Sequence, residues 1–383
     1  MRIFITSGYS YWGQLDPRTI FEPVDGAGQT AGGETAMVQT ATQLAKRGHE
    51  VLLFHDIARP TRYRGVDYLP KDHALKIVTR LKGDVLISWE DPRPLGMNHT
   101  CDLVIYSMQT NSMTMTILDY GVDYYQAVSR WHVETLLRSD LSLSPDRARP
   151  KFFLSPNGVD PARYQNRPER VPFRAIYSSS PDRGLHHLLR IWPEVRRIAP
   201  QAELRIFYEM QRWFDITESI GEGATTYRQY REVKEGLKRC EDLGVSVMGG
   251  VGQWRLAQEQ MMASAMVYPC DTVDKATEGF GISILEAMTA GIPAITTDCD
   301  AFGEVWGDSA EIIPLPVEGK EYLWAEKVAK LIDPSTPEWA NRVRIQRKKA
   351  AALTWDKVGK DYERFISEAL AKKREVAREG TPV

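Results

Sequence analysis

The sequence is poor in cysteine, in net charge and in long apolar runs. Its 383 residues include four widely spaced cysteines, which is typical of reduced thiols in a cytosolic protein and predicts no structural disulfide. Lys and Arg number 49 against 51 Asp and Glu, so a formal charge of -2 gives no general attraction to nucleic acid. The N-terminal apolar stretch is too short for a signal peptide, and no run approaches the ~18 apolar residues of a membrane span. We therefore expect a cytoplasmic protein that does not bind nucleic acid.

What is present is the pattern of an α/β protein. A hydrophobic share of 43% and a charged share of 26% indicate ordinary globular domains, and the length predicts two or three of them. Short apolar runs alternate with helical stretches, as in strand 2–7, helix 33–47 and strand 50–55. Such runs are typical of parallel strands covered on both faces. The same alternation restarts at Phe173, which predicts a second domain with a parallel sheet.

The domain boundaries follow from proline, glycine and helical periodicity. A stretch rich in proline, glycine and charge after Ser155 is typical of an interdomain linker. We predict a first domain over residues 1–165, a second over 166–350, and a C-terminal helical segment over 351–383 that returns to the first domain. Apolar residues recur at helical spacing from Trp355 to about Arg378. The basic run 372–374 in this helix could touch a membrane surface, although a solvated face is the simpler interpretation.

The most informative segment is 278–293, EGFGISILEAMTAGIP. It predicts a helix from about Gly281 to Ala290, because Gly291 suits a left-handed C-cap and Pro293 cannot continue a helix. Glu278 lies just before this helix and Glu286 about a turn inside it. Between the two carboxylates are the free amides of Phe280, Gly281 and Ile282, and a helix N-terminus of this kind binds anions. A nucleotide diphosphate sugar presents sugar hydroxyls, phosphates and ribose hydroxyls in the matching order.

This segment resembles the signature of retaining glycosyltransferases of the GT-B fold, family four (glycosyl transferases group 1), in which seven residues separate two glutamates. The alternative is an amphipathic helix with a solvated Glu286 and a glycine turn. The resemblance implies two Rossmann-like domains that face a cleft, with the donor nucleotide in the second domain. It also implies that Glu278 contacts hydroxyls of the donor sugar and that Glu286 contacts the ribose.

Four further segments fit the same resemblance. Residues 178–185, SSSPDRGL, resemble the loop that holds the donor diphosphate, and we predict that Arg183 stabilises the leaving diphosphate, against the alternative of a surface arginine. Gly32 and Gly33 resemble a glycine loop that approaches the donor phosphates, unless they form an ordinary surface loop. Gly250 and Val251 occupy the segment in which relatives hold the nucleotide base. Asn157 and Gly158 resemble the interdomain turn of the family.

Other positions are open. Many relatives carry a histidine near the sugar, and here Gln109 or His132 could take that place, although ordinary core or rim roles are at least as good an explanation. Tyr11, Trp12, Trp89 and Arg93 could contact a sugar, but aromatic packing in loops is the commoner explanation. The only Asp-x-Asp, residues 298–300, has no clustered histidine or further carboxylate, so we expect no metal site. We expect no cofactor other than the donor substrate.

The predicted function is transfer of a hexosyl group from a UDP- or GDP-sugar to a hydroxyl of a carbohydrate or other acceptor, with retention and without a metal. A nucleotide-sugar epimerase of the same general fold and a non-catalytic protein that binds sugar nucleotides are the alternatives. The sequence does not indicate which nucleotide, sugar or acceptor is used, nor an oligomeric state.

Overall fold

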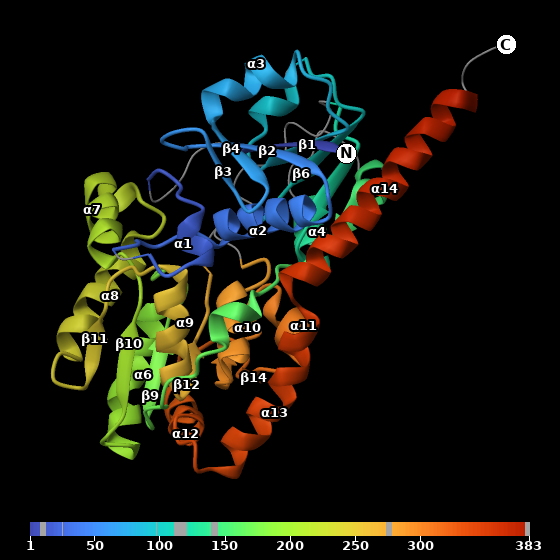
Figure 1. The fold of residues 1–383 in the computed structure, drawn as a ribbon. Helices are drawn as coiled ribbons and strands as arrows, with labels where there is room; N and C mark the ends of the chain where they lie inside the picture. Colours follow the sequence, from blue (N-terminus) through green and yellow to red (C-terminus); the bar gives the residue numbers. More distant parts are fainter. Residues whose placement is uncertain are drawn as a thin grey trace. The chain divides into compact units, whose positions relative to one another are not determined.

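The computed structural model describes residues 1–7, 13–24, 26–96, 98–110, 121–138, 145–272 and 278–379. The chain forms two compact units (Figure 1). The N-terminal unit comprises Met1–Arg18, Ala31–Gly158 and Thr354–Val383, and the C-terminal unit comprises Thr19–Thr30 and Val159–Leu353. The chain thus passes between the units at 18–19, 30–31, 158–159 and 353–354, whereas the sequence analysis set boundaries at 165 and 350. Residues 19–30 group with the C-terminal unit, which the sequence did not predict.

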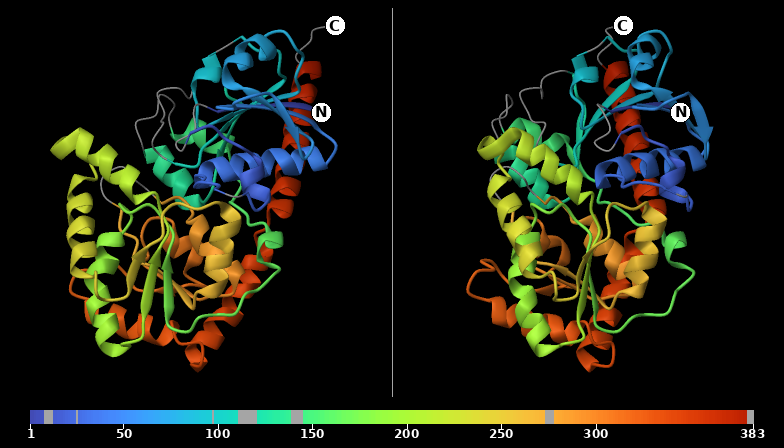
Figure 2. Two further views of the ribbon diagram at one scale, coloured as in Figure 1. Left: turned by 60° about the vertical axis from the view of Figure 1, so that its left-hand side comes forward. Right: turned by 90° about the vertical axis from the view of Figure 1, so that its left-hand side faces the viewer.

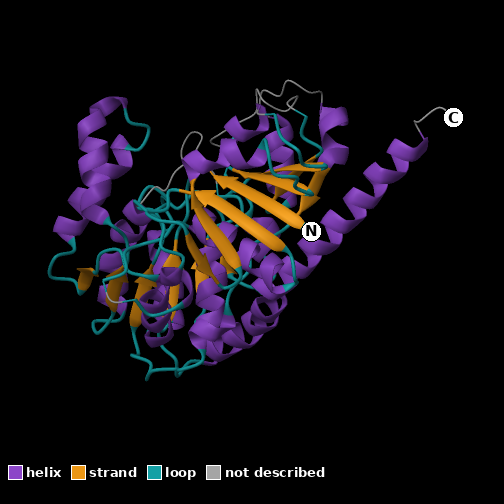
Figure 3. Ribbon diagram, turned by 45° about the horizontal axis from the view of Figure 1, so that its top comes forward, coloured by secondary structure: helices purple, strands orange, loops and turns teal. Residues whose placement is uncertain are grey.

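The N-terminal unit is built on an eight-stranded sheet with the order β3-β4-β2-β1-β5-β6-β7-β8, whose central strands run side by side (Figure 3). All neighbouring strands are parallel except β3 and β4. Strand β1 is apolar because both faces of the sheet are covered, and Ile3, Phe4 and Ile5 have no exposed surface. The strands are β1 (Arg2–Ser7), β2 (Glu50–His55), β3 (Thr61–Tyr63), β4 (Val66–Pro70), β5 (Val85–Trp89), β6 (Leu103–Ser107), β7 (Tyr124–Ala127) and β8 (Phe152–Leu154).

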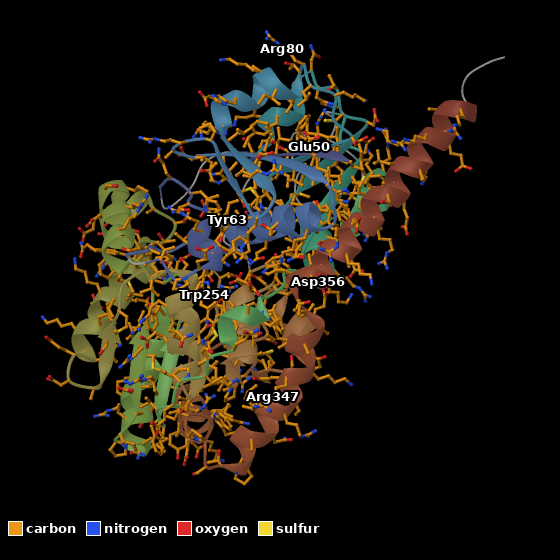
Figure 4. All side chains as sticks on the ribbon, in the orientation of Figure 1. Glu50, Tyr63, Arg80, Trp254, Arg347 and Asp356 are labelled. Atoms are coloured by element: carbon orange, nitrogen blue, oxygen red, sulfur yellow. The ribbon has the colours of Figure 1, made fainter. Side chains whose placement is uncertain are left out.

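Helix α14 (Trp355–Glu379) packs within the N-terminal unit, as predicted for the C-terminal segment. Gly359 allows a close approach to α2 (Gly32–Lys46), because a Cβ at this position would lie 2.3 Å from the Cβ of Gln43. On another face of α14, Phe365 stacks on Phe153 of β8 with ring centroids 3.7 Å apart. Asp356, labelled in Figure 4, forms an ion pair of 2.9 Å with Arg47 of α2. Shorter helices of this unit are α3 (Ala74–Val78), α4 (Arg130–Arg138) and α5 (Pro145–Ala148), and α1 (Arg18–Phe21) begins at the last residue before the chain enters the C-terminal unit.

The C-terminal unit contains a six-stranded parallel sheet with the order β11-β10-β9-β12-β13-β14. Helices cover both faces of this sheet (Figure 2). The strands are β9 (Arg174–Tyr177), β10 (Glu203–Ile206), β11 (Val245–Val247), β12 (Ala265–Tyr268), β13 (Ala294–Thr296) and β14 (Glu311–Ile312). The helices are α6 (Leu185–Ile198), α7 (Met210–Ile220), α8 (Tyr227–Arg239), α9 (Gln253–Met262), α10 (Ile282–Ala290), α11 (Phe302–Trp306), α12 (Glu321–Leu331) and α13 (Pro337–Ala352).

The predicted fold class, two doubly wound α/β domains, is therefore confirmed. Each sheet has one place at which the strand order reverses direction. In the N-terminal unit it lies between β1 and β5, and in the C-terminal unit between β9 and β12. Open parallel sheets bind ligands outside the carboxyl ends of the strands at such a switch point. All four cysteines are free thiols.

Candidate functional site

The site in the C-terminal unit begins where the segments after β9 and β12 meet. Gly184, between the β9 loop and α6, has a φ of +97°, and a Cβ there would lie 1.9 Å from the carbonyl oxygen of Pro269, which follows β12. Only glycine fits this conformation and this distance. Arg183 is therefore held beside the carboxyl end of β12, at the switch point of the sheet.

Arg183 and Glu278 are brought together at this point. Arg183 Nη1 lies 2.9 Å from Glu278 Oε1, and each side chain is less than a fifth exposed, at 19% and 18%. The Tyr268 hydroxyl donates to Glu278 Oε2 at 2.7 Å and accepts from the Ser179 hydroxyl at 2.9 Å. Burial raises the pKa of Tyr268 well above its ordinary value, which keeps this hydroxyl a donor. Two residues far apart in sequence thus form one fixed, charged pair.

The Glu278 carboxylate affects the charge state of Arg183. Burial acts to lower the pKa of Arg183, but Glu278 together with Tyr268, Asp182 and Cys270 outweighs it, and the pKa lies well above its ordinary value. The guanidinium therefore stays charged, and its planar fork suits a phosphate group. A cation and a carboxylate in contact can bind an anion and a hydroxyl group side by side.

Asp300 positions Glu278, a role that the sequence analysis missed. The backbone N–H of Glu278 donates to Asp300 Oδ2 at 2.8 Å, and the Thr272 hydroxyl donates to the same oxygen at 2.8 Å. Asp300 itself has a φ of +51°, a conformation that few non-glycine residues adopt. Asp298 accepts from the backbone of Leu315 at 2.9 Å, so the two aspartates point to different partners. Their Asp-x-Asp pattern is explained by turn structure.

Helix α10 begins at Ile282 and ends at Ala290, as the sequence predicted. Gly281 forms the N-cap with a φ of +78°, and a Cβ there would lie 2.5 Å from the ring of Phe302. Gly291 forms the left-handed C-cap with a φ of +77°. The carbonyl of Phe280 accepts from the Trp306 indole at 2.6 Å, which fixes the turn before the helix. The N–H groups at this N-terminus have no partner within the helix and can bind an anion.

Glu286 lies in the second turn of α10 and has a different environment from Glu278. It is 5% exposed, and its Oε1 lies 3.7 Å from Nη1 of Arg163, which has no exposed side-chain surface. Burial raises the pKa of Glu286, although the Arg163 guanidinium acts in the opposite direction. Arg163 also donates to the side chain of Gln253. Arg163 lies in the turn Pro161–Tyr164, shortly after Asn157 and Gly158, and the sequence analysis did not single it out.

The segment around Gly250 and Val251 lies at the end of β11, before α9. The N–H of Gly250 donates to Glu209 Oε1 at 3.2 Å, and a Cβ at Gly250 would lie 2.5 Å from the same oxygen. The N–H of Glu209 in turn donates to Gln29 Oε1 at 3.1 Å. A base contact through the amide of Gly250 would have to replace the Glu209 carboxylate, and this contact stays a prediction.

In the N-terminal unit, Gly32 and Gly33 are the first residues of α2. A Cβ at Gly33 would lie 3.0 Å from Glu90 Oε2, so the close approach here is to a carboxylate of the same unit. Glu34 Oε2 accepts from the Ala31 N–H at 3.1 Å, and its Oε1 lies 3.7 Å from His55 Nε2. The predicted phosphate contact of Gly32 and Gly33 stays a prediction.

Gln109 and His132 differ in accessibility. Gln109 is partly exposed, and its amide donates to Gln126 Oε1 at 3.4 Å. His132 on α4 has no exposed surface, and burial lowers its pKa to about 4, so a ligand contact would require its neighbours to move. Tyr11 and Trp12 lie outside the described residues. Trp89 is buried and Arg93 pairs with Asp91 at 2.8 Å.

One group in the described part of the chain has metal-ligand geometry. Ligand atoms of His187, Asp271 and Glu318 lie within 4.8 Å of one another. His187 Nε2 is 3.1 Å from Asp271 Oδ2, and Nδ1 on the other side of the ring is 3.7 Å from Glu318 Oε1. Asp271 thus hydrogen-bonds Nε2, whereas Glu318 faces the opposite nitrogen beyond hydrogen-bond distance, and carboxylates on opposite sides of one imidazole do not favour shared coordination of one ion.

Comparisons with known proteins agree with this architecture. Residues 174–333 match the family described as glycosyl transferases group 1. A search of curated protein sequences finds no match. Within the described residues, no helix has both the length and the apolar character needed to cross a bilayer.

Several solved structures share the fold over nearly the whole chain. AviGT4, a glycosyltransferase involved in avilamycin A biosynthesis, has a TM-score of 0.63 at 15% identity, with 97% of this chain and 98% of that chain covered. Sucrose-phosphate synthase from Thermosynechococcus elongatus has a TM-score of 0.65 at 13% identity, covering 97% and 100%. HepE from Anabaena in complex with UDP-glucose gives 0.65 at 13%, also covering 97% and 100%. The predicted resemblance is thus confirmed for residues 174–333, at the level of glycosyl transferases group 1, and the fold is shared over nearly the whole chain.

Proposed function

We propose that this chain, whose residues 174–333 match glycosyl transferases group 1, transfers a hexosyl group from a UDP- or GDP-sugar to an acceptor hydroxyl with retention of configuration. The observation that carries the proposal is the ion pair of Arg183 and Glu278 at the switch point of the C-terminal unit. The pair offers a cation for phosphate and a carboxylate for sugar hydroxyls within one contact.

The donor would lie along the segment from Glu278 to Glu286. Its diphosphate would bind the Arg183 guanidinium and the N–H groups of Phe280, Gly281 and Ile282, where the helix dipole favours negative charge. Glu278 would accept hydrogen bonds from the sugar, and Glu286 from the ribose. HepE, which shares the fold, has been solved with UDP-glucose, and this supports a nucleotide diphosphate sugar as the donor class.

The chemistry follows from where charge develops. The bond between the anomeric carbon and the phosphate oxygen breaks, and the electron pair stays on the leaving oxygen. Arg183 and the amides at the start of α10 stabilise that charge, which is the largest effect that such a site can supply. The acceptor oxygen forms its bond on the same face of the sugar, and its proton passes to the departing phosphate. Because guanidinium and amides neutralise the diphosphate, we propose that no divalent metal is required.

The first test is thermal unfolding of the protein with millimolar UDP, GDP, ADP or dTDP, because a ligand that binds the native state raises the midpoint. We expect UDP or GDP to raise it, and the corresponding sugars then serve as donors. Arg183→Gln should lower kcat about 100-fold or more. Arg190→Gln is the matched control, because Arg190 lies on α6, which begins just after Arg183, and forms only partly exposed ion pairs of 3.4–4.0 Å with Glu232, Glu318 and Glu321.

The outcomes separate the proposal from its alternatives. Equal turnover of the Arg183 and Arg190 variants would refute the catalytic role of Arg183. Conversion of the donor sugar without any acceptor would indicate an epimerase. Nucleotide binding without turnover of any donor would indicate a binding protein.

A further inference from the structure

Glu90 occupies the switch point of the N-terminal sheet. It follows directly after β5, whose last residue, Trp89, pairs with Ser7 at the end of β1. These two strands flank the place where the strand order reverses, so Glu90 stands where open parallel sheets bind ligands. Asp56, which follows β2, lies on the same edge of the sheet but away from this point.

The backbone of Glu90 is held in an uncommon conformation. Its φ is +51°, which costs a non-glycine residue about 1 kcal/mol or more, and its N–H donates to the carbonyl of Ser107 at 2.9 Å. The Thr110 hydroxyl donates to Glu90 Oε1 at 3.0 Å. The chain therefore fixes the direction of this carboxyl group from both its backbone and its side chain.

The first turn of helix α2 approaches the same carboxyl group closely. At Gly33 in the first turn of α2, a Cβ would lie 3.0 Å from Glu90 Oε2, which is tighter than ordinary contact. A side chain at this position would press on the carboxylate and cover it. Glycine avoids this contact beside the start of α2, and Glu90 as a whole residue is only partly buried.

The electrostatic environment of Glu90 favours partners that donate hydrogen bonds to its carboxyl group. Burial raises the pKa of Glu90, and the nearby Glu34 raises it further, whereas the hydrogen bond from Thr110 acts in the opposite direction. A carboxylate in this setting is stabilised by partners that donate hydrogen bonds and carry no negative charge. The amide of Gln109 and the hydroxyl of Thr110 add further polar groups at the same edge. Sugar hydroxyls match this set, because one carboxylate can accept from two neighbouring hydroxyls.

We infer that Glu90 binds hydroxyl groups of a carbohydrate acceptor and so determines acceptor specificity. This inference rests on the proposed function, since it needs a glycosyl acceptor. It assigns to the N-terminal unit a binding carboxylate that the sequence did not single out. The donor contacts of Arg183, Glu278 and Glu286 are independent of it.

The test compares Glu90→Gln with Asp56→Asn, using as donor the UDP- or GDP-sugar that the wild-type protein turns over. The acceptor probes are methyl glucoside, methyl mannoside and methyl galactoside, and donor hydrolysis by water is measured in their absence. We expect Glu90→Gln to raise the acceptor KM tenfold or more, with unchanged hydrolysis and an unchanged nucleotide-induced shift of the unfolding midpoint. Asp56→Asn should match the wild type, since Asp56 pairs only loosely with Lys71 at 3.8 Å.

Each outcome has a distinct meaning. An unchanged acceptor KM in Glu90→Gln would overturn the inference and leave the proposed function intact. A loss of hydrolysis together with transfer would also overturn it, because the carboxylate would then serve the donor or the fold. A wild-type protein that hydrolyses the donor but transfers to none of the glycosides would overturn the sugar-type acceptor. A protein that turns over no nucleotide sugar would instead refute the proposed function, on which the inference depends.

Discussion

The substitution Gly184→Ala tests how the switch point of the C-terminal unit is assembled. The residue has a φ of +97°, and a Cβ would lie 1.9 Å from the carbonyl oxygen of Pro269, which belongs to backbone and cannot rotate away. The left-handed conformation costs an alanine about 1–2 kcal/mol. Relief of the contact requires the loop to move from β12, and overpacking of this kind costs roughly 1–3 kcal/mol. We therefore expect a loss of about 3 kcal/mol in the free energy of unfolding.

Gly291→Ala is the matched control for the backbone effect alone. Its φ is +77°, but the nearest atoms to an added Cβ are guanidinium nitrogens of Arg167 and Arg170 at 3.9 and 4.0 Å. We expect a loss of about 1 kcal/mol. For a unit of this size, 1 kcal/mol lowers the unfolding midpoint by roughly 2–4 °C, so Gly184→Ala should lower it by about 6–12 °C.

Differential scanning calorimetry of both variants measures this difference. Gly184→Ala should also reduce the nucleotide-induced shift of the midpoint, because displacement of the loop moves Arg183 away from Glu278. Equal losses in the two variants would refute the reasoning, since the contact with Pro269 would then contribute nothing.

Two further predictions concern buried charge. Burial lowers the pKa of His55 from 6.5 to about 4, so the unfolded chain binds a proton between these pH values and the native chain does not. The free energy of unfolding should therefore fall as pH decreases from 6.5 to 4, and His55 should account for about 3 kcal/mol of this fall. Urea titrations of the His55→Asn variant at both pH values should show a fall that is smaller by this amount. Arg163→Gln leaves Glu286 buried without its nearby cation, so we expect the free energy of unfolding in denaturant to fall by about 3–5 kcal/mol. Arg163→Lys should recover part of this loss. A loss below about 1 kcal/mol in Arg163→Gln would show that the pair contributes little.

Local chemistry made much of the fold predictable. Glycine and proline after Ala290 determined the end of α10, and the amphipathic period from Trp355 determined α14. The sequence analysis assigned Arg183 and Glu278 to donor binding but did not predict that their side chains form an ion pair. Sequence spacing alone gave no distance between the two side chains.

What the sequence did not reveal depends on backbone conformation and on long-range contacts. The β3–β4 hairpin turns at Arg64 and Gly65, both with positive φ, but an Arg-Gly pair is a weaker signal than Asn-Gly. Glu90 and Asp300 have left-handed backbone conformations, which their residue types do not predict. Arg163 meets Glu286 only because two segments more than a hundred residues apart pack together. A glutamate that directly follows an apolar strand at the switch point was the one available signal for Glu90.

Two of the four places where the chain passes between the units, 158–159 and 353–354, lie side by side in the backbone. The N–H of Val159 donates to the carbonyl of Leu353 at 3.0 Å, and a Cβ at Gly158 would lie 2.7 Å from the carbonyl carbon of Thr354. In topological terms, residues 159–353 are therefore a long insertion whose two ends nearly touch, and residues 19–30 are a second, short one that belongs to the same unit. Joining Gly158 directly to Thr354 would close the host chain without a spacer, and the excised segment could be circularised with a short one. This arrangement suits the exchange of residues 159–353 for a related insert, together with residues 19–30 of the same unit.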